Sequence, residues 1–558
     1  MARNIGGFER VVTMFHRVQS ISRIALVSPP PIGVGTETEM LSCIRFGTPE
    51  YCLALLGSIL RQSFPAAEIL AISGRRLARS ETPAVERKLY GDLSLCIASF
   101  PLAEKCIVET ACECDVALIS ATFTQEAAIC CRIISAIRER NPSLTVIVGG
   151  TDAMFRSQTY LRAGADIVVT GEAETVLPDL VKELSNGREH PTYQIVGRAF
   201  RIEESPCIVS ASNASRCSTG LSLTFEPSPE FAKVLFGDEL HEGKPPNGVS
   251  EHSAYFETSR GCRPGNCGFC SCGPKTGGAA GYRVIAPHRL KTQLESISGA
   301  GVNTLQIIDD NFLAREDISE SGSGLFEVLE IMRGLGFAWE FANGLQMSRL
   351  LKDGMPRQDL IDALFNPCIS PSGWLIGGYR AFLSFETALR PRPPRDYRRW
   401  PKMNGVGIEE AIALLESFDK AGVQMLSLGV MIGFPDDTMR DIEETVEGMK
   451  VVEKTIRSLN RQRYAQGLAL MEIHWDVVIY MLLPGTRDFQ RYRHRILFGD
   501  DYNTAPELLN FQTAAYWPDN FTPWELTEIR AEIAREFNAV NVLDGSSGST
   551  RHVYTAHG

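Results

Sequence analysis

Short apolar runs and amphipathic stretches alternate along residues 20–190. The apolar runs are rich in β-branched residues and cover 23–30, 67–73, 114–123, 144–150 and 165–172. Helical periodicity lies between them, most clearly over 51–61, 126–140 and 175–184. Buried strands that alternate with helices are typical of a parallel, doubly wound sheet. We therefore expect an N-terminal Rossmann-like domain over residues 20–190 of an α/β protein.

The same alternation returns over residues 251–490. Strand-like runs cover 253–259, 303–309, 337–344, 380–387, 425–434 and 471–482, with helical patterns between them. Six strand–helix units predict a partial (β/α)6 barrel of the TIM type, with catalytic residues at the carboxyl ends of the strands. Residues 191–250 lack this rhythm and are expected to form a connector with a few short strands. Over residues 491–558, the pattern predicts a small helical C-terminal region with a disordered Gly/Ser-rich tail.

Composition narrows the range of partners. The chain has 558 residues, 44% hydrophobic, and a formal net charge of -11, which argues against a broad basic surface for nucleic acid. No apolar run approaches the roughly 18 residues that a membrane span needs, and the first residues lack the apolar core of a signal peptide. Fifteen cysteines without an export signal favour reduced thiols or metal ligands. We expect a cytoplasmic protein that binds neither nucleic acid nor membrane.

Cysteine spacing supplies the strongest chemical signal. Residues 257–274 read ETSRGCRPGNCGFCSCGP, directly after the first strand of the second block. Thiolates of Cys262, Cys267 and Cys270 are suited to bind three irons of a [4Fe–4S] cluster and leave the fourth iron open. A zinc site would need a second Cys or His pair, and a redox Cys-x-x-Cys would leave Cys262 without a role. If Cys272 were a fourth ligand, the cluster would be closed and would serve electron transfer.

This motif resembles that of the radical S-adenosylmethionine (SAM) superfamily, Cys-x3-Cys-x2-Cys with an aromatic residue before the last cysteine. Phe269 fills the aromatic position, and one extra residue separates Cys262 from Cys267. The runs DVALISATFTQ, TVIVGGTDA and AGADIVVTGEAETVLPDLVKEL resemble the N-terminal domain of its cobalamin-binding branch. The runs LQIIDDNF, LSFETA, KMNG, VMIGFPDDT and LLPGT follow in the order of the superfamily's barrel motifs.

The resemblance implies roles for residues at the strand ends of the barrel. Asp309 and Asp310 would meet the methionyl ammonium of SAM, with helix capping or a solvated turn as the alternative. Ser384 and Glu386 would hold ribose or methionyl groups from one face of a strand, with a structural hydrogen bond as the alternative. Phe269 would pack near the adenine or in the core. Gly433 would admit the adenine, and Thr438 is expected to cap the following helix.

Four loops follow strands of the first block, at 28–31, 120–125, 149–152 and 171–174, where an open parallel sheet binds its ligand. The resemblance implies cobalamin as that ligand. The candidate contacts are Thr122, Thr124, Gly149, Gly150, Gly171 and Glu172. No Asp-x-His-x-x-Gly motif is present, so no histidine is nominated as the lower cobalt ligand. A degenerate Rossmann-like domain that binds a nucleotide or nothing is the alternative.

Five arginines, Arg390, Arg392, Arg395, Arg398 and Arg399, follow the fourth strand. They form either an anion-binding site or a solvated loop. The resemblance implies methyl transfer from methylcobalamin to an unactivated carbon or a phosphinate phosphorus of a small, anionic specialised-metabolite precursor, as in antibiotic biosynthesis. An external flavodoxin or ferredoxin would supply electrons. A cobalamin-using cyclase or rearrangement enzyme and a non-catalytic cobalamin and iron–sulfur electron carrier are the alternatives.

Overall fold

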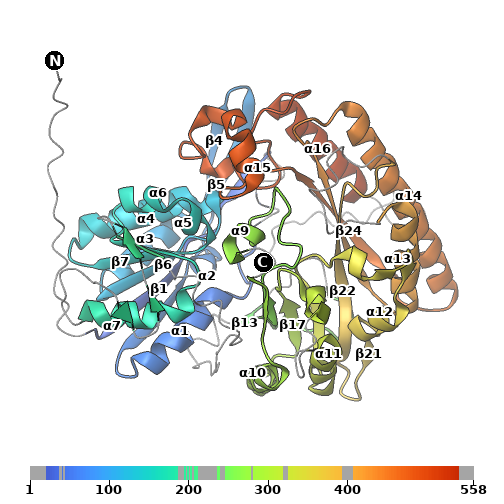
Figure 1. Cartoon of the computed structure of the whole chain (residues 1–558), viewed down its shortest axis with the longest axis horizontal. Helices are drawn as coiled ribbons and strands as arrows, with labels where there is room; N and C mark the ends of the chain where they lie inside the picture. Colours follow the sequence, from blue (N-terminus) through green and yellow to red (C-terminus); the bar gives the residue numbers. More distant parts are fainter. Residues whose placement is uncertain are drawn as a thin grey trace.

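The computed structural model describes residues 21–36, 41, 44–185, 194–195, 198–199, 201–203, 207–210, 236–238, 245–277, 281–317, 324–391 and 406–538. Two α/β lobes lie side by side, each built around its own sheet (Figure 1). The first lobe contains the strands of the N-terminal block. The second contains the six strand–helix units and the C-terminal helix.

A seven-stranded sheet forms the first lobe. Its order is β11-β12-β8-β7-β6-β1-β3, and only β11 runs antiparallel to its neighbour. The five predicted strands are confirmed, and their bounds are β1 (Arg23–Ser28), β3 (Glu68–Ser73), β6 (Val116–Ser120), β7 (Thr145–Gly149) and β8 (Ile167–Thr170). The chain crosses from β1 to β3 on one side and from β3 back to β6 on the other. The carboxyl ends of β1 and β6 therefore flank the switch point where such sheets bind ligands.

Alternate residues of each strand in this sheet enter two separate cores. Ile24 and Leu26 pack beneath α1 (Tyr51–Ser63) and α7 (Leu177–Ser185). Ala25 and Val27 belong to the core on the other side, beneath α3 (Pro101–Ala111) and α4 (Ala127–Arg140). Helices on both faces explain why the strands are apolar throughout instead of alternating with polar residues. The doubly wound prediction is therefore confirmed.

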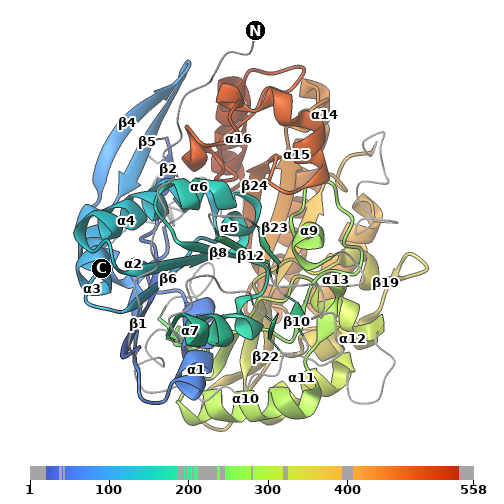
Figure 2. The same ribbon diagram turned by 60° about the vertical axis from the view of Figure 1, so that its left-hand side comes forward.

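Two features of the first lobe were not predicted. A three-stranded antiparallel sheet, β2-β5-β4, contains β2 (Gly33–Gly35), β4 (Ala84–Tyr90) and β5 (Leu93–Ser99), and it projects toward the C-terminal helices (Figure 2). In addition, β11 (Arg201–Glu203) and β12 (Cys207–Ser210), which lie within the expected connector, extend the main sheet beyond β8. The β4 sequence AVERKLY carries little apolar signal because most of the strand is exposed.

Six parallel strands in chain order form the second sheet. They are β14 (Ser253–Phe256), β17 (Thr304–Ile307), β18 (Ala338–Phe341), β22 (Leu375–Glu386), β23 (Met425–Ile432) and β24 (Glu472–Ile479). Helices α10 (Pro287–Gly299), α11 (Leu325–Gly334), α12 (Gln358–Leu364), α13 (Ile408–Lys420) and α14 (Met439–Ala465) connect them. The six predicted strands are all present. A short strand, β13 (Phe236–Gly237), pairs antiparallel with β14 at the edge.

The two faces of this second sheet differ in chemistry. Leu305, Leu383 and Leu428 belong to the large apolar core that includes the connecting helices. The opposite face buries polar groups: Arg380 donates to Glu340 at 3.2 Å and to the Ser427 hydroxyl. Buried polar groups need such partners. One face therefore builds the core, and the other offers polar side chains to the interior.

The far edge of the second sheet is covered by α16 (Pro523–Asn538). The Asn538 amide donates to the Trp475 carbonyl and accepts from its N–H, each at 2.9 Å, and the Arg530 guanidinium donates to the Val477 carbonyl. These side chains satisfy backbone groups of β24 that a further strand would otherwise bond. The predicted C-terminal helix is confirmed, and it stabilises the edge of the sheet.

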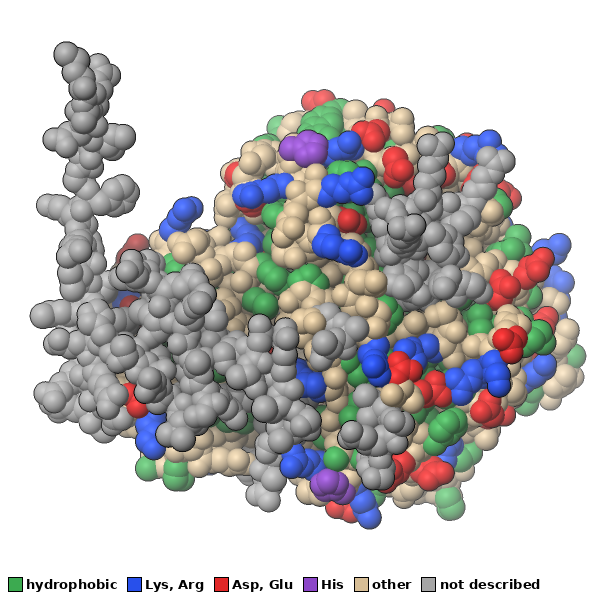
Figure 3. Space-filling model, viewed as in Figure 1, with side chains coloured by type: hydrophobic (Ala, Val, Ile, Leu, Met, Phe, Trp, Pro, Cys, Tyr) green, Lys and Arg blue, Asp and Glu red, His purple; other side chains and the backbone are tan. Residues whose placement is uncertain are grey.

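On the face shown in Figure 3, Lys and Arg side chains are interspersed with Asp and Glu, and apolar side chains are scattered between them. Within the described residues, no helix is both long and apolar enough to cross a bilayer.

Candidate cofactor site between the two sheets

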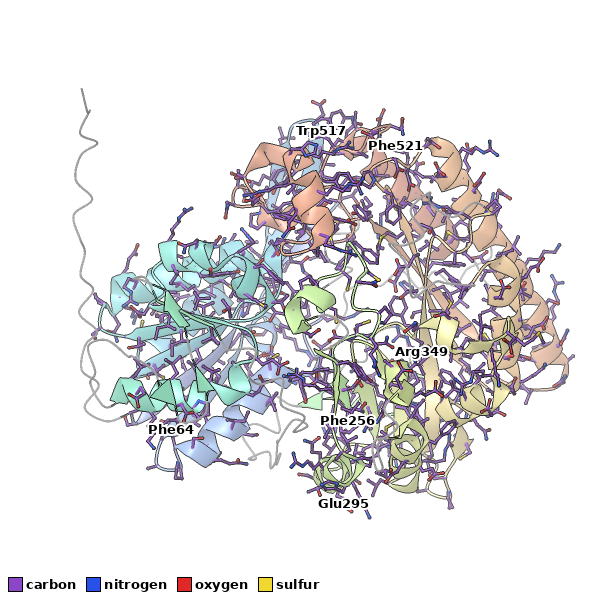
Figure 4. All side chains as sticks on the ribbon, viewed as in Figure 1. Phe64, Phe256, Glu295, Arg349, Trp517 and Phe521 are labelled. Carbon is purple, nitrogen blue, oxygen red and sulfur yellow. The ribbon has the colours of Figure 1, made fainter. Side chains whose placement is uncertain are left out.

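The cysteine loop begins where β14 ends, close to the junction of the lobes. Phe256, labelled in Figure 4 near the middle of the molecule, is the last residue of that strand. A two-stranded ribbon follows, β15 (Ser259–Arg260) paired with β16 (Arg283–Val284), and the cysteines lie between its strands. Gly261 has a φ of +92° as the chain turns from β15 into the loop. A Cβ at Gly273 would lie 2.1 Å from the Gly265 carbonyl oxygen, so the loop folds tightly upon itself.

Two other segments hold this loop. The Gly261 N–H donates to Asp310 at 3.1 Å, and Asn311 donates to the Cys262 sulfur at 3.5 Å. On the other side, the Asp488 N–H donates to the Gly268 carbonyl at 3.0 Å. Asp310 and Asn311 follow β17, and Asp488 lies in α15 (Arg487–Tyr492) after β24. Carboxyl ends of the first, second and sixth strands thus meet at the cysteine loop.

The thiols have unequal environments. The Cys272 thiol donates a hydrogen bond to Cys262, which lowers the pKa of Cys262 to about 6 despite its burial. The same bond, together with burial, raises the pKa of Cys272. The Cys272 N–H donates to the Cys270 sulfur at 3.5 Å. Hydrogen bonds to sulfur favour thiolates, the form in which cysteine binds iron.

The residue types of this loop and the lowered pKa of Cys262 fit an iron–sulfur cluster, but the positions of its side chains do not form a metal site within the part of the chain that the structure describes. Cys262, Cys267 and Cys270 lie in one loop and are partly exposed, and Cys272 is buried beside Cys262. Among the described residues, however, no three His, Cys, Asp or Glu side chains are arranged as a metal site. The roles of the three cysteines therefore stay predictions.

Asp309 and Asp310 are neighbours in sequence with different environments. The buried Asp309 carboxylate accepts from the Thr258 N–H at 2.7 Å and from the hydroxyls of Thr258 and Ser259. Burial raises the pKa of Asp309 to about 7, although these hydrogen bonds oppose the rise. Asp310 is more exposed and lies 3.6 Å from the Lys275 ammonium. Asp309 thus fixes the start of the ribbon, and Asp310 is the more exposed of the two carboxylates, whose role toward a ligand stays a prediction.

The sequence predicts that Ser384 and Glu386 lie on one face of their strand, and this prediction is wrong. A β-bulge shifts the register between them, so that Ser384 pairs with Gly429 and Glu386 pairs with the next residue, Val430. Glu386 also has a φ of +52°. A bulge adds one residue to a strand and interrupts the two-residue alternation of its side chains. Ser384 stays on the polar face with Phe382, and Glu386 is buried.

Gly433 and Phe269 both have packing roles. Gly433 has a φ of +76°, and a Cβ there would lie 2.3 Å from Leu526 of α16. Its N–H donates to Asp437 at 2.9 Å. Phe269 lies with its ring centroid 6.5 Å from that of Tyr480, against the main core. These contacts favour the packing explanations, and the roles of both residues toward adenine stay predictions. Thr438 caps α14 as predicted, since its N–H donates to Asp441 at 2.8 Å.

The candidate cobalamin residues line the carboxyl edge of the first sheet. Gly150 has a φ of +118°, and a Cβ there would lie 2.5 Å from the Ala121 carbonyl oxygen, so only glycine fits between β6 and β7. A Cβ at Gly149 would meet nothing closer than 3.9 Å, which leaves open space at this rim. The Thr122 hydroxyl pairs with Ser120 at 3.1 Å, and the Thr124 hydroxyl donates to the buried Asp152.

Residues 100–181 match the model of the B12 binding domain. The first lobe contains a B12-binding domain. The match spans β6, β7 and β8, and it includes all six candidate residues. The open rim and the close backbone approach at Gly150 fit the large, flat ligand that this description implies. The contact made by each residue stays a prediction.

A second comparison covers most of the chain. It is 23% identical over 455 residues to a protein of Pyrococcus horikoshii named "Uncharacterized methyltransferase PH0819". The alignment spans 78% of this chain and 79% of that protein, so the similarity extends well beyond the B12-binding domain.

The loop with Gly171 and Glu172 follows β8 at the same edge and also contacts the second lobe. Glu172 is paired with Arg283, and it lies 3.7 Å from Arg260. Glu174, which the sequence interpretation did not single out, lies 2.5 Å from Arg260. The B12-binding domain and the cysteine loop are therefore joined by ion pairs. Sequence alone offered no signal for them beyond charged residues in loops.

Arg390 is the only one of the five clustered arginines among the described residues. It is buried, and its guanidinium donates to both Asp437 oxygens at 2.8 and 3.0 Å and to Thr445 at 2.8 Å. Arg390 is therefore neither part of a solvated loop nor free for a substrate anion. Arg392, Arg395, Arg398 and Arg399 lie outside the described residues, as does the KMNG run.

Proposed function

We propose that this chain is a cobalamin-dependent radical SAM methyltransferase. A single observation carries the proposal: the β15–β16 ribbon, which carries the cysteine loop between its strands, is paired with the Gly171–Glu174 loop of the B12-binding domain through Arg260 and Glu174. A cluster at the cysteines and cobalamin on the first sheet would then share one space between the lobes. The name of the Pyrococcus relative agrees with methyl transfer.

In this proposal the second sheet is a partial TIM-type barrel, and residues of the chain bind and shield the reactants. Cys262, Cys267 and Cys270 hold the [4Fe–4S] cluster, and Asp310 offers a carboxylate to the ammonium of SAM. When bound, SAM at the cluster supplies a radical that removes a hydrogen atom, and methylcobalamin supplies the methyl group. The lobes exclude water from the space between them, which protects reactive species. An external flavodoxin or ferredoxin supplies electrons.

The substrate is proposed to bind on the polar face of the second sheet. Strand register places Phe382, Ser427 and His474 in one row and Ser384, Gly429 and Asp476 in the next. Four of these side chains, those of Phe382, Ser384, His474 and Asp476, are partly exposed. The acceptor is an unactivated carbon or a phosphinate phosphorus of a small molecule.

The test is anaerobic reconstitution of the full chain with iron, sulfide, SAM, hydroxocobalamin and a low-potential chemical reductant in place of the flavodoxin or ferredoxin. Bound iron and cobalt are measured, together with 5′-deoxyadenosine and S-adenosylhomocysteine. Methyl transfer predicts both products, and a rearrangement predicts 5′-deoxyadenosine alone. A chain that binds no cobalt, or an electron paramagnetic resonance signal that SAM does not alter, would contradict the proposal.

One observation favours a second candidate, an electron carrier with a closed cluster. Cys272 lies in hydrogen-bond contact with Cys262 and is therefore within reach of a metal bound there. Single alanine variants of the four loop cysteines separate the two cases, with the exposed Cys368→Ala as control. The methyltransferase predicts that Cys272→Ala retains the cluster and SAM cleavage. The electron carrier predicts that Cys272→Ala loses the cluster as Cys262→Ala does.

A further inference from the structure

Two arginines of the ribbon beside the cysteine loop are aimed at the B12-binding domain. Arg260 and Arg283 are cross-strand partners in the antiparallel β15–β16 pair, so their side chains leave the same face. Arg260 lies 2.5 Å from Glu174, and Arg283 is paired with Glu172. Both glutamates belong to the loop that follows β8. Two cross-strand cations thus meet two anions of one loop across the junction of the lobes.

Arg260 is held on a second side by Glu257, which lies just before its strand. Its Nε atom lies 2.9 Å from both oxygens of Glu257, and the Tyr51 hydroxyl donates to the same carboxylate at 3.4 Å. Side chains of Arg260, Glu174 and Glu257 are only 13%, 11% and 12% exposed. Ion pairs this far from water are weakly screened by salt, and loss of one partner leaves a poorly solvated charge.

The path from these ion pairs to the cysteines is short. Arg260 precedes Gly261 and Cys262 in the chain, and both are held by the loop after β17, through Asp310 and Asn311. A movement of the Gly171–Glu174 loop would therefore pull on Arg260, and through one intervening residue on Cys262.

We propose that Arg260 and Arg283, with Glu172 and Glu174, form a clamp that transmits cobalamin binding in the first lobe to the position of Cys262. In this clamp Arg260 is a positioning residue. Glu172 acts through its ion pair with Arg283 in place of a direct contact with cobalamin. The inference rests on the proposed function in one respect, that the first lobe binds cobalamin. It does not depend on the cluster or on the reaction.

The experiment measures alkylation of Cys262 by iodoacetamide in the metal-free full-length protein, with and without saturating hydroxocobalamin. Mass spectrometry follows the peptide that carries Cys262. The variants are Arg260→Lys and Glu174→Gln, and cobalamin affinity is measured for each by absorbance. The control is Glu104→Gln, which breaks an ion pair with Arg132 between α3 and α4 at 2.6 Å. Arg260→Lys keeps the charge, so it tests the fork geometry of the guanidinium with little risk to folding.

In the wild type and in Glu104→Gln, we expect hydroxocobalamin to change the alkylation rate at least about fivefold, the lower end of usual coupling between sites. In Arg260→Lys and Glu174→Gln, we expect less than about a twofold change at saturation. An equal effect in all four proteins would mean that cobalamin shields Cys262 directly, and it would overturn the clamp. The clamp would also be overturned if the wild type binds hydroxocobalamin and the alkylation rate of Cys262 does not change. Wild type that binds no hydroxocobalamin would overturn the proposed function itself.

Discussion

Buried charged side chains give single residues strong effects in this protein. Arg390 is paired through two hydrogen bonds with Asp437, which in turn accepts from the N–H groups of Gly433 and Phe434. The arginine therefore holds the turn after β23 in place. Burial raises the pKa of Asp437, and Arg390 opposes that rise, so the pair depends on both members.

We predict that Arg390→Met lowers the free energy of unfolding by about 3–5 kcal/mol, because it leaves Asp437 buried without a counter-charge. Urea unfolding measures the loss. The control is Arg440→Met, which removes an exposed pair with Glu444 and should change stability by about 0.5 kcal/mol or less. An equally small loss for Arg390→Met would indicate an arginine that is free for other ligands.

Glu126 is expected to make stability depend on pH. Burial raises the pKa of this carboxyl from 4.5 to about 7, although Arg75 at 2.7 Å opposes the rise. The folded protein therefore retains the proton at a pH where the unfolded chain has lost it. The resulting stabilisation is complete below pH 4.5 and is lost as pH rises toward 7.

The measurement compares wild type with Glu126→Gln, which stays neutral at every pH. Between pH 4.5 and 7, we predict that the unfolding free energy of wild type falls by about 3 kcal/mol relative to Glu126→Gln. Above pH 7 the difference should be constant. A difference that stays flat from pH 4.5 to 7 would contradict a raised pKa at this site.

Among the elements, the edge of the second sheet is stabilised by a helix instead of another strand. Asn538 lies at the C-terminal end of α16 and forms two hydrogen bonds with the backbone of Trp475. The amide of one side chain thus replaces the backbone of a neighbouring strand. The planar amide suits this role because its NH₂ group donates while its carbonyl oxygen accepts.

We predict that Asn538→Ala lowers the free energy of unfolding by about 1–3 kcal/mol, because it leaves backbone groups of a buried residue without partners. Hydrogen exchange at the Trp475 amide should become faster. Glu532→Ala, on an exposed position of the same helix, is the matched control. Unchanged exchange at Trp475 in Asn538→Ala would show that water replaces the amide without cost.

For the whole molecule, contacts far apart in sequence join the B12-binding lobe to the C-terminal region. Glu507 is buried and accepts from Lys88 at 2.5 Å and from the Tyr90 hydroxyl, both on β4. Nearby, Arg156 donates to the Tyr502 carbonyl and to Asn503, each at 3.2 Å. A Cβ at Gly485 would lie 2.2 Å from Phe155, so the backbone after β24 packs closely on the first lobe. These contacts hold the lobes around the space between them.

We predict that Glu507→Ala increases hydrogen exchange over residues 84–99 more than Tyr90→Phe does. The alanine removes the partner of two groups and leaves the Tyr90 hydroxyl buried without an acceptor, whereas Phe at position 90 removes one donor and retains the Lys88 pair. Exchange within β6 and β7 should change in neither variant. Equal effects in the two variants would show that the Tyr90 hydrogen bond alone holds the β4–β5 hairpin.

The sequence alone determined the two sheets, the order of most strands and helices, and the position of the cysteine motif after the first strand of the second sheet. These features follow from local periodicity: apolar residues repeat with the period of the element that buries them. The β4–β5 hairpin escaped this approach because β4 is largely exposed and carries few apolar residues, so no pair of apolar strands is visible in the sequence. The bulge between Ser384 and Glu386 could not be predicted either, because one extra residue in a strand does not change the local pattern of apolar and polar residues in a recognisable way.

Only the tertiary structure decided which distant side chains meet. It pairs Arg260 and Arg283 with Glu172 and Glu174, buries Arg390 against Asp437, and separates the roles of Asp309 and Asp310. A charged residue in a loop has the same appearance in a sequence whether it is solvated or paired. The distinction depends on which loops the two sheets bring together, and that follows from strand order and packing of the whole chain.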